Sequence, residues 1–209
     1  NNLVSIETEL KSKLNKVKII AVSKTFSKDD ILPLIDHGHI HFGENKVQEA
    51  LEKWTLIKKD YSHVKLHMIG KLQTNKVKFV IPLFDYIHSL DNIKLAKKIS
   101  SEQIKLNKSP KIFIQVNLGM ENQKNGIDPS ELKSFYKTCV NDLSLNIIGL
   151  MCLPPNDNKS DYYFSEMKKL KLELNLKELS MGMSSDYLKA VNHEASYLRI
   201  GSKIFGSRI

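Results

Sequence analysis

Lys24 is the residue whose type and position point most directly to chemistry. It follows VKIIAVS (17–23), an apolar and β-branched run typical of a strand buried on both faces. A lysine held where burial disfavours its charged form can attack an aldehyde carbon as the free amine. The same position also suits a lysine whose stem packs on the rim of the fold while its ammonium reaches water, so both interpretations stay open.

Glycine and hydroxyl side chains combine in two segments near the end of the chain. SMGMSSD (180–186) contains Ser180 and Ser184, and Gly201 and Ser202 follow the last apolar run. Hydroxyl groups and closely approaching backbone amides can together bind a phosphate group. Ordinary turns and helix caps have the same composition, so the phosphate interpretation depends on both segments following neighbouring strands.

Arg199 is unusual in a chain that uses lysine almost everywhere. Lysine and arginine together number 32, of which only Arg199 and Arg208 are arginine. An arginine inside YLRIG (197–201) suggests a site that needs a planar and permanently charged donor. A salt bridge at the rim of the fold would use the same residue type, and this alternative remains.

Two other kinds of site are not supported by the sequence. The net charge of +9 comes from lysines scattered among apolar residues, as on solvated helix faces, so we expect no specific nucleic-acid partner. His39 and His41 alternate in DHGHIHFG (36–43). No cysteine or carboxylate lies near them at ligand spacing, so we expect no metal site.

The composition is that of a globular protein in a reducing compartment. No apolar run approaches the roughly 20 residues of a membrane helix, and the opening segment lacks the profile of a signal peptide. Cys139 and Cys152 show no disulfide or metal spacing. We therefore expect a cytoplasmic protein without a membrane partner. We also expect a monomer rather than a dimer.

Short apolar runs alternate with longer amphipathic stretches along the chain. Eight runs are predicted as strands, at residues 17–23, 39–42, 65–70, 85–90, 111–117, 145–153, 178–182 and 197–201. Helices are predicted between them, at 28–38, 46–59, 74–82, 92–106, from 128 onward, 161–174 and 185–194, with a further one at 3–14. Ser27 and Asn45 are expected to cap two of these helices.

Strict alternation of strands and helices predicts an α/β fold with a parallel sheet and right-handed crossovers. Eight such units match a closed (β/α)8 barrel of the TIM type, although an open, doubly wound sheet has the same alternation. No long linker or repeat divides the sequence, so we expect a single domain over residues 1–209. Functional groups of a parallel barrel follow the C-terminal ends of its strands, which brings Lys24, Asn45, Ser184 and Gly201 to one end.

Seven segments occur in the order found in a known protein family: AVSKT (21–25), FGENKVQE (42–49), HMIGKLQTNK (67–76), NLGMENQKNGI (117–127), GLM (149–151), LSMGMSSD (179–186) and LRIGSKIFGSR (198–208). Through them the chain resembles, from about Val17 to its C-terminus, the pyridoxal 5′-phosphate homeostasis proteins. The resemblance implies the barrel fold of the alanine racemase N-terminal domain. It also implies pyridoxal 5′-phosphate, a form of vitamin B6, as the cofactor.

Matching the motifs implies a role for each site residue. Lys24 corresponds to the lysine that forms a Schiff base with the cofactor, and Asn45 to a residue near it. Arg199 corresponds to an arginine that faces the pyridine nitrogen. An arginine there would keep the nitrogen unprotonated and the ring a weaker electron sink. The phosphate cradle corresponds to Ser184, Gly201 and Ser202.

The resemblance implies a carrier or buffer of the cofactor rather than an enzyme, with cofactor-dependent enzymes as clients. Relatives that catalyse racemisation or decarboxylation on this barrel have a second, β-rich domain with an acid–base group. The sequence ends at Ile209, so we expect no such domain and no catalytic cycle. The alternatives are a small amino-acid racemase that uses Lys24 alone and a basic nucleic-acid-binding module.

Overall fold

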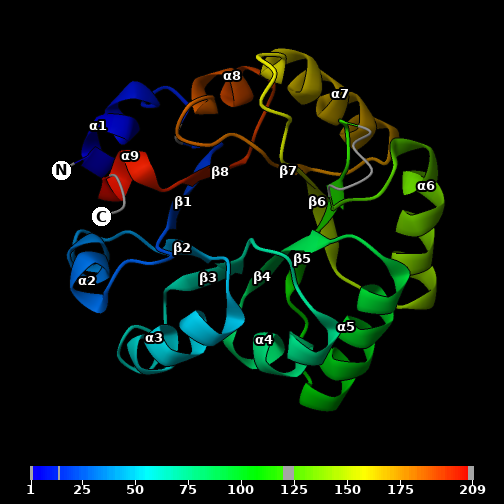
Figure 1. The fold of residues 1–209 in the computed structure, drawn as a ribbon, viewed down its shortest axis with the longest axis horizontal. Coiled ribbons are helices and arrows are strands. Elements are labelled where there is room, and N and C mark those ends of the chain that lie inside the picture. Colours follow the sequence, from blue (N-terminus) through cyan, green and yellow to red (C-terminus); the bar gives the residue numbers. More distant parts are fainter. Residues whose placement is uncertain (1, 14, 120–124, 207–209) are drawn as a thin grey trace.

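Eight parallel strands close into a barrel in the computed structural model, which describes residues 2–13, 15–119 and 125–206. Each strand pairs with the next in the sequence, and β8 pairs with β1 (Figure 1). This closure confirms the (β/α)8 prediction and excludes the open, doubly wound sheet. The strands are β1 (Lys18–Val22), β2 (His41–Glu44), β3 (Lys65–Met68), β4 (Tyr86–Leu90), β5 (Lys111–Val116), β6 (Ile147–Cys152), β7 (Glu178–Ser180) and β8 (Tyr197–Ile200).

Helices surround the barrel (Figure 1). They are α1 (Asn2–Glu9), α2 (Lys28–Asp36), α3 (Val47–Asp60), α4 (Val77–Leu83), α5 (Ile93–Leu106), α6 (Pro129–Lys137), α7 (Ser160–Glu173), α8 (Tyr187–Asn192) and α9 (Ser202–Phe205). A 3-10 turn, η1 (Thr74–Lys76), precedes α4, and a π-helical turn, η2 (Thr138–Asp142), follows α6. In the described part of the chain, none of the helices has the combination of length and hydrophobicity that a membrane span requires.

Local sequence signals set the ends of several helices. Ser27 lies at the N-cap of α2, as expected, and its backbone N–H donates to the Asp30 carboxylate at 2.9 Å. Asn92 caps α5 by accepting from the backbone N–H of Leu95 at 2.8 Å. After α2, Gly38 turns the chain toward β2 with a φ of +94°, a left-handed conformation that glycine adopts without steric cost.

Four details of the predicted elements need correction. Helix α3 begins at Val47, so Asn45 precedes the helix and does not cap it. Helix α1 ends at Glu9, where the exposed polar stretch 11–13 no longer packs on the barrel. Strand β2 spans 41–44 rather than 39–42, because its pairing with β3 continues through Glu44, a charged residue that hydrophobicity patterns assign to a loop. The short helix α9 was not predicted.

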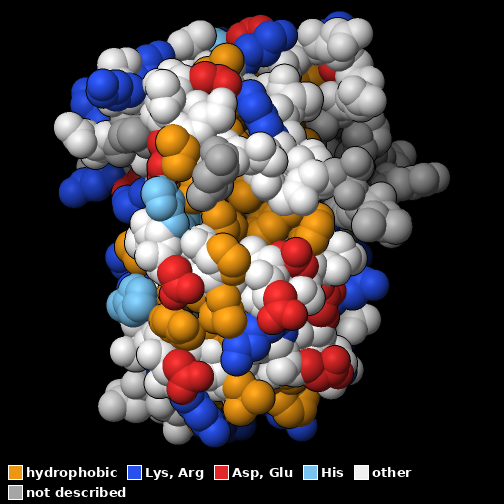
Figure 2. Space-filling view, turned by 90° about the vertical axis from the view of Figure 1, so that its left-hand side faces the viewer, with side chains coloured by type: hydrophobic (Ala, Val, Ile, Leu, Met, Phe, Trp, Pro, Cys, Tyr) orange, Lys and Arg blue, Asp and Glu red, His pale blue; other side chains and the backbone are white. Residues whose placement is uncertain are grey.

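Lysines on the outside of the barrel lie among acidic and apolar side chains. The ammonium of Lys98 lies 2.8 Å from the Glu102 carboxylate, and that of Lys168 lies 2.7 Å from the Glu194 carboxylate. On the face shown in Figure 2, the basic side chains are interspersed with acidic and hydrophobic ones rather than gathered in one continuous area. That face therefore lacks the basic stripe that a nucleic-acid backbone requires.

Imidazole and aromatic rings fill the inside of the barrel. His67 stacks on Tyr86 with 4.1 Å between ring centroids, and His88 stacks on Phe113 at 4.3 Å. Both imidazoles are fully buried. The other apolar side chains of this inner cluster come from Ile20, Met151 and Tyr197.

The imidazoles form a hydrogen-bonded chain that ends at an arginine. His41 Nδ1 lies 2.9 Å from His67 Nε2, and His67 Nδ1 lies 2.9 Å from His88 Nε2. His88 Nδ1 lies 2.8 Å from Ser180 Oγ, which accepts from Arg199 Nη1 at 2.7 Å. When the Ser180 hydroxyl donates to His88, every bond of the chain has one donor and one acceptor. The chain therefore holds the Ser180 lone pair toward Arg199.

Burial keeps these imidazoles neutral. It lowers the pKa of His67 and of His88 well below the usual 6.5, and it lowers the pKa of His41 to about 4. Arg199 is a second cause at His88, because its charge repels a proton there. His41, His67, His88, Ser180 and Arg199 thus form a hydrogen-bonded chain inside the barrel. Of these five residues, only Arg199 carries a positive charge.

We expect the unfolding free energy to be highest above pH 6.5 and to fall as the pH is lowered toward 4. The unfolded chain protonates its imidazoles below its ordinary pKa of about 6.5, whereas the folded barrel leaves the buried ones neutral. The loss should approach about 1.4 kcal/mol per pH unit for each of these histidines. Urea unfolding between pH 7.5 and 4.5 measures this slope. The window lies mostly above the range in which carboxylates titrate.

His63→Gln provides the matched control, because His63 is exposed between α3 and β3. This variant should keep the slope of the parent. A parent whose unfolding free energy is constant from pH 6.5 to 4.5 would contradict the neutral interior.

Ser180→Ala should lower the unfolding free energy by about 1–3 kcal/mol, because it leaves two buried groups without their shared partner. Those groups are His88 Nδ1 and Arg199 Nη1. The control is Ser89→Ala. Ser89 is 2% exposed, and its hydroxyl has no hydrogen-bond partner among the described residues. Urea unfolding at pH 7.5 should show a small change for Ser89→Ala, and equal losses would disprove the role of Ser180.

Candidate functional site

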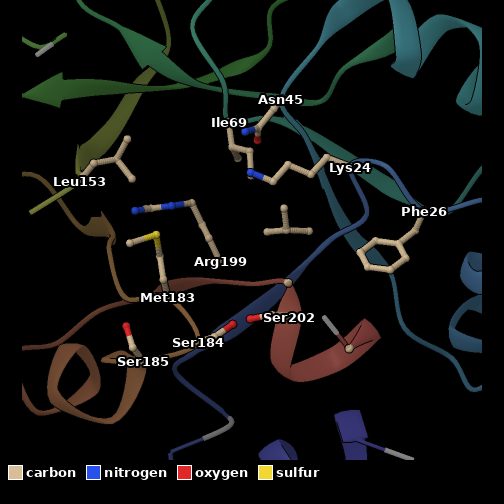
Figure 3. A pocket seen from close by; sticks show the side chains of 13 residues that line it. Lys24, Phe26, Asn45, Ile69, Leu153, Met183, Ser184, Ser185, Arg199 and Ser202 are labelled. Atoms are coloured by element: carbon tan, nitrogen blue, oxygen red, sulfur yellow. The ribbon is translucent and has the colours of Figure 1, made fainter. Parts of the chain in front are cut away.

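A cavity of about 510 Å³ opens at the C-terminal ends of the strands, where functional sites of such barrels lie. Its volume is in the range of sites for small molecules and cofactors. Figure 3 shows side chains from several strand ends pointing into it. The cavity is lined by Val22, Lys24, Phe26, Asn45, Ile69, Leu153, Met183, Ser184, Ser185, Arg199, Gly201, Ser202 and Gly206.

Lys24 enters the cavity from the turn that follows β1. The side chain is half-buried and extends toward Ile69 and Asn45 (Figure 3). The turn is tight, since the backbone N–H of Phe26 donates to the carbonyl of Ser23 at 3.1 Å. The position expected for a covalent lysine is thus occupied by an amine that reaches into the cavity.

Asn45 follows β2 and depends on a glycine at the end of β3. A Cβ atom on Gly70 would lie 2.2 Å from the Asn45 carbonyl oxygen and 2.7 Å from its Cα. A larger residue at position 70 would therefore displace the backbone of Asn45. Residues 43–45 (GEN) and 68–70 (MIG) thus together fix one wall of the cavity.

Arg199 reaches the cavity from the inside of β8. It is 4% exposed, and Nη2 donates to the Cys152 carbonyl at 2.7 Å while Nη1 donates to Ser180. Both of these acceptors, a hydroxyl and a carbonyl, are uncharged. Burial lowers the pKa of Arg199 from its usual very high value. The site therefore contains a positive charge held by neutral acceptors.

Ser184, Gly201 and Ser202 also line the cavity. Ser184 and Ser202 lie below Lys24 in Figure 3. Ser184 Oγ accepts from the backbone N–H of Lys203 at 3.4 Å, which brings the loop after β7 to the first turn of α9. This bond occupies the backbone N–H of Lys203, and those of Ile204 and Phe205 donate to the Gly201 carbonyl. This wall of the cavity offers the hydroxyl groups of Ser184 and Ser202, with the backbone at Gly201 beside them.

The structure brings six of the seven predicted site residues to the cavity: Lys24, Asn45, Ser184, Arg199, Gly201 and Ser202. Ser180 does not line the cavity. It was expected to donate to a phosphate, but it is fully buried inside the barrel and contacts Arg199 and His88. Its side chain points inward because Ser180 belongs to strand β7, one side of which faces the barrel interior.

Sequence reasoning missed the apolar part of the cavity and the support behind it. Phe26 lines the cavity and stacks on Phe205 of α9 with 4.7 Å between ring centroids. His67 and His88 support Arg199 through Ser180. His67 lies in β3 and His88 in β4, and the side of each strand that faces inward could be assigned only once the barrel interior was known. No group of three His, Cys, Asp or Glu side chains among the described residues could hold a metal ion.

Three kinds of donor therefore line one cavity. An amine can bond to an aldehyde, hydroxyl and amide groups can bind a phosphate, and a guanidinium can face the nitrogen of an aromatic ring. Pyridoxal 5′-phosphate carries all three features. The donor set of Lys24, Ser184 with Ser202, and Arg199 fits that molecule.

Comparison with known proteins agrees with this fit. The family model of the alanine racemase N-terminal domain matches residues 2–209. A pyridoxal phosphate homeostasis protein of Aquifex aeolicus is 36% identical over 203 residues, which cover 93% of this chain and 88% of the relative. One of Haemophilus influenzae is 38% identical over 205 residues, covering 93% and 86%.

Solved structures of PipY from Synechococcus elongatus have the same fold. The structure without PLP (pyridoxal phosphate) superposes with a TM-score of 0.91 at 34% identity and covers 98% of both chains. The structure with PLP bound gives a TM-score of 0.87 at 35% identity and covers 95% of this chain and 97% of PipY. The chain therefore belongs to the alanine racemase N-terminal domain family, among the pyridoxal phosphate homeostasis proteins.

Proposed function

We propose that this protein binds pyridoxal 5′-phosphate in the cavity at the end of the barrel and acts in its homeostasis as a carrier or buffer. The observation that carries the proposal is the convergence of Lys24, Arg199 and the Ser184–Ser202 wall on one cavity of suitable size. The homeostasis proteins among its relatives and the PLP-bound PipY structure support the same cofactor.

Lys24 holds the cofactor through a reversible covalent bond. When bound, the cofactor supplies an aldehyde that reacts with amines. The deprotonated Lys24 Nζ attacks the aldehyde carbon, a C=N bond forms, and the aldehyde oxygen leaves as water. Water can reverse this step, so the protein can release what it holds.

Ser184, Ser202 and the backbone at Gly201 anchor the phosphate through hydroxyl and amide donors. Arg199 faces the ring nitrogen and disfavours a proton there, because two adjacent positive charges repel each other. An unprotonated ring withdraws electrons weakly, which suppresses reactions of a bound amino acid. The phosphate contacts and Arg199 thus both favour binding the cofactor over catalysis with it.

The lining of the cavity also favours a carrier over a racemase. None of its described residues is a carboxylate, imidazole or phenol. Racemisation needs proton transfer on two sides of a substrate carbon, and Lys24 can serve only one. Within the described lining, the second acid–base group is absent.

We further infer that the protein works in the cytoplasm as a monomer and passes the cofactor to enzymes that depend on it. The thiols support a reducing compartment: Cys139 and Cys152 are unpaired and buried, and burial raises the pKa of each to about 12. The closed barrel supports a monomer, because its described strands offer no free edge to another copy. The paired surface lysines argue against a nucleic-acid partner.

The covalent site can be mapped by adding pyridoxal 5′-phosphate, reducing with borohydride and identifying the labelled peptide by mass. We expect a visible absorbance band and one adduct on Lys24. Lys24→Ala should lose both the absorbance band and the adduct while keeping its circular dichroism spectrum. Its residual binding should come from the proposed phosphate contacts of Ser184, Gly201 and Ser202. Lys46→Ala, at an exposed lysine near the cavity, should behave like the parent. An adduct spread over many lysines would remove the assignment.

The carrier role predicts no catalytic turnover. The loaded protein should exchange the α-hydrogen of amino acids for deuterium no faster than the same concentration of free pyridoxal 5′-phosphate. Proton NMR in deuterated buffer measures this rate. Exchange well above the free cofactor, and lost in Lys24→Ala, would favour the racemase instead.

A further inference from the structure

A second lysine lies beneath the turn that carries Lys24. Lys53 belongs to α3, and its side chain is only 9% exposed. Its Nζ donates to the Ser23 carbonyl at 2.8 Å and to the Phe26 carbonyl at 2.9 Å. Those two carbonyls bracket Lys24 in the sequence, so one ammonium group ties both ends of the turn to α3.

A buried carboxylate holds this ammonium in place. Glu44 Oε1, from the fully buried Glu44 side chain, lies 2.9 Å from Lys53 Nζ. The same oxygen accepts from the Ser23 hydroxyl at 2.7 Å and from Trp54 Nε1 at 2.8 Å. A buried ammonium needs such a partner, because an unpaired charge away from water is strongly unfavourable. Glu49 adds a second, longer contact at 3.3 Å.

The turn needs this support because its backbone conformation is unfavourable. Thr25 has a φ of +69°, in the left-handed region that β-branched residues rarely adopt. Its backbone N–H donates to Glu49 Oε1, so α3 contacts the strained residue as well as the two ends of the turn. The orientation of residues 23–26 thus depends on side chains of another element.

We propose that Lys53, paired with Glu44, is a positioning residue that fixes the direction in which Lys24 leaves its turn. Lys53 is not among the residues that line the cavity, so it would act through Lys24 rather than on the cofactor. A misdirected amine forms its bond less favourably even when the ligand is seated, because geometry controls such reactions strongly. The inference rests on the proposed function, in which Lys24 carries the covalent bond.

The test compares two ligands that differ only at the reacting group. Pyridoxal 5′-phosphate has an aldehyde, whereas pyridoxine 5′-phosphate has an alcohol that cannot bond to lysine. In Lys53→Met, affinity for the aldehyde should fall about 10- to 100-fold. Affinity for the alcohol should change less than about twofold, since the phosphate and ring contacts remain. Lys59→Met, at an exposed lysine of the same helix, should match the parent for both ligands.

A second readout needs no ligand. In the cofactor-free protein, amide hydrogen exchange of the peptide covering 23–28 should be faster in Lys53→Met than in the parent or in Lys59→Met. Because Lys53→Met leaves the buried Glu44 carboxylate unpaired, Lys53→Met combined with Glu44→Gln is the variant to use if the single one unfolds. The double variant should show the same selective loss.

The outcomes separate the two hypotheses. Equal losses for both ligands, or no loss for either, in a protein whose parent prefers the aldehyde would overturn the positioning role alone. A parent that binds both ligands equally and gives no adduct at Lys24 would overturn the proposed function, and the positioning role with it. A selective loss of aldehyde binding with faster exchange at 23–28 supports the inference.

Discussion

The pairing of β1 with β8 is the contact on which the site depends. Residues 18–21 lie in register with residues 197–200, which closes the sheet and places the two ends of the sequence side by side. Lys24 follows one of these strands and Gly201 the other, so the proposed covalent lysine and the proposed phosphate-binding residues meet only if the barrel closes. Neither strand end contains a complete site by itself. The cavity is thus a property of the whole fold rather than of a local motif.

Closure also creates an interior that must be filled, and this chain fills part of it with neutral polar groups. A row of imidazoles reaches from His41 to Ser180, and Arg199 completes it. A carboxylate in the place of Ser180 would bind the guanidinium more strongly, but it would also cancel the charge. Neutral acceptors hold Arg199 in position without cancelling its positive charge. The positive charge that Arg199 brings to the cavity is therefore held in place by residues inside the barrel.

Much of this arrangement could be predicted from the sequence, because buried parallel strands are continuous apolar runs that stand out from amphipathic helices. KIIAV and KIFIQV belong to this class, and both lie where they were predicted. Glu44 shows the limit. It occupies a strand position although it is charged, because Ser23, Lys53 and Trp54 contact its Oε1 oxygen from other elements. Such partners become visible only when the elements are packed. The same holds for Ser180, whose inward direction depends on which side of β7 faces the interior.

Lys24 and Lys53 illustrate how environment divides one residue type into two roles. Lys53 is enclosed by carboxylates and carbonyls, so its ammonium is stabilised as a charged hydrogen-bond donor. Lys24 reaches a cavity whose described lining contains the cation of Arg199 and no carboxylate. In the proposed function this amine bonds to an aldehyde, a reaction that requires its neutral form. In a chain with 32 basic residues, the proposed role of each of these two lysines thus follows from what surrounds it. Glu44 and Glu49 lie under the turn of Lys24, beside Lys53, and neither lines the cavity.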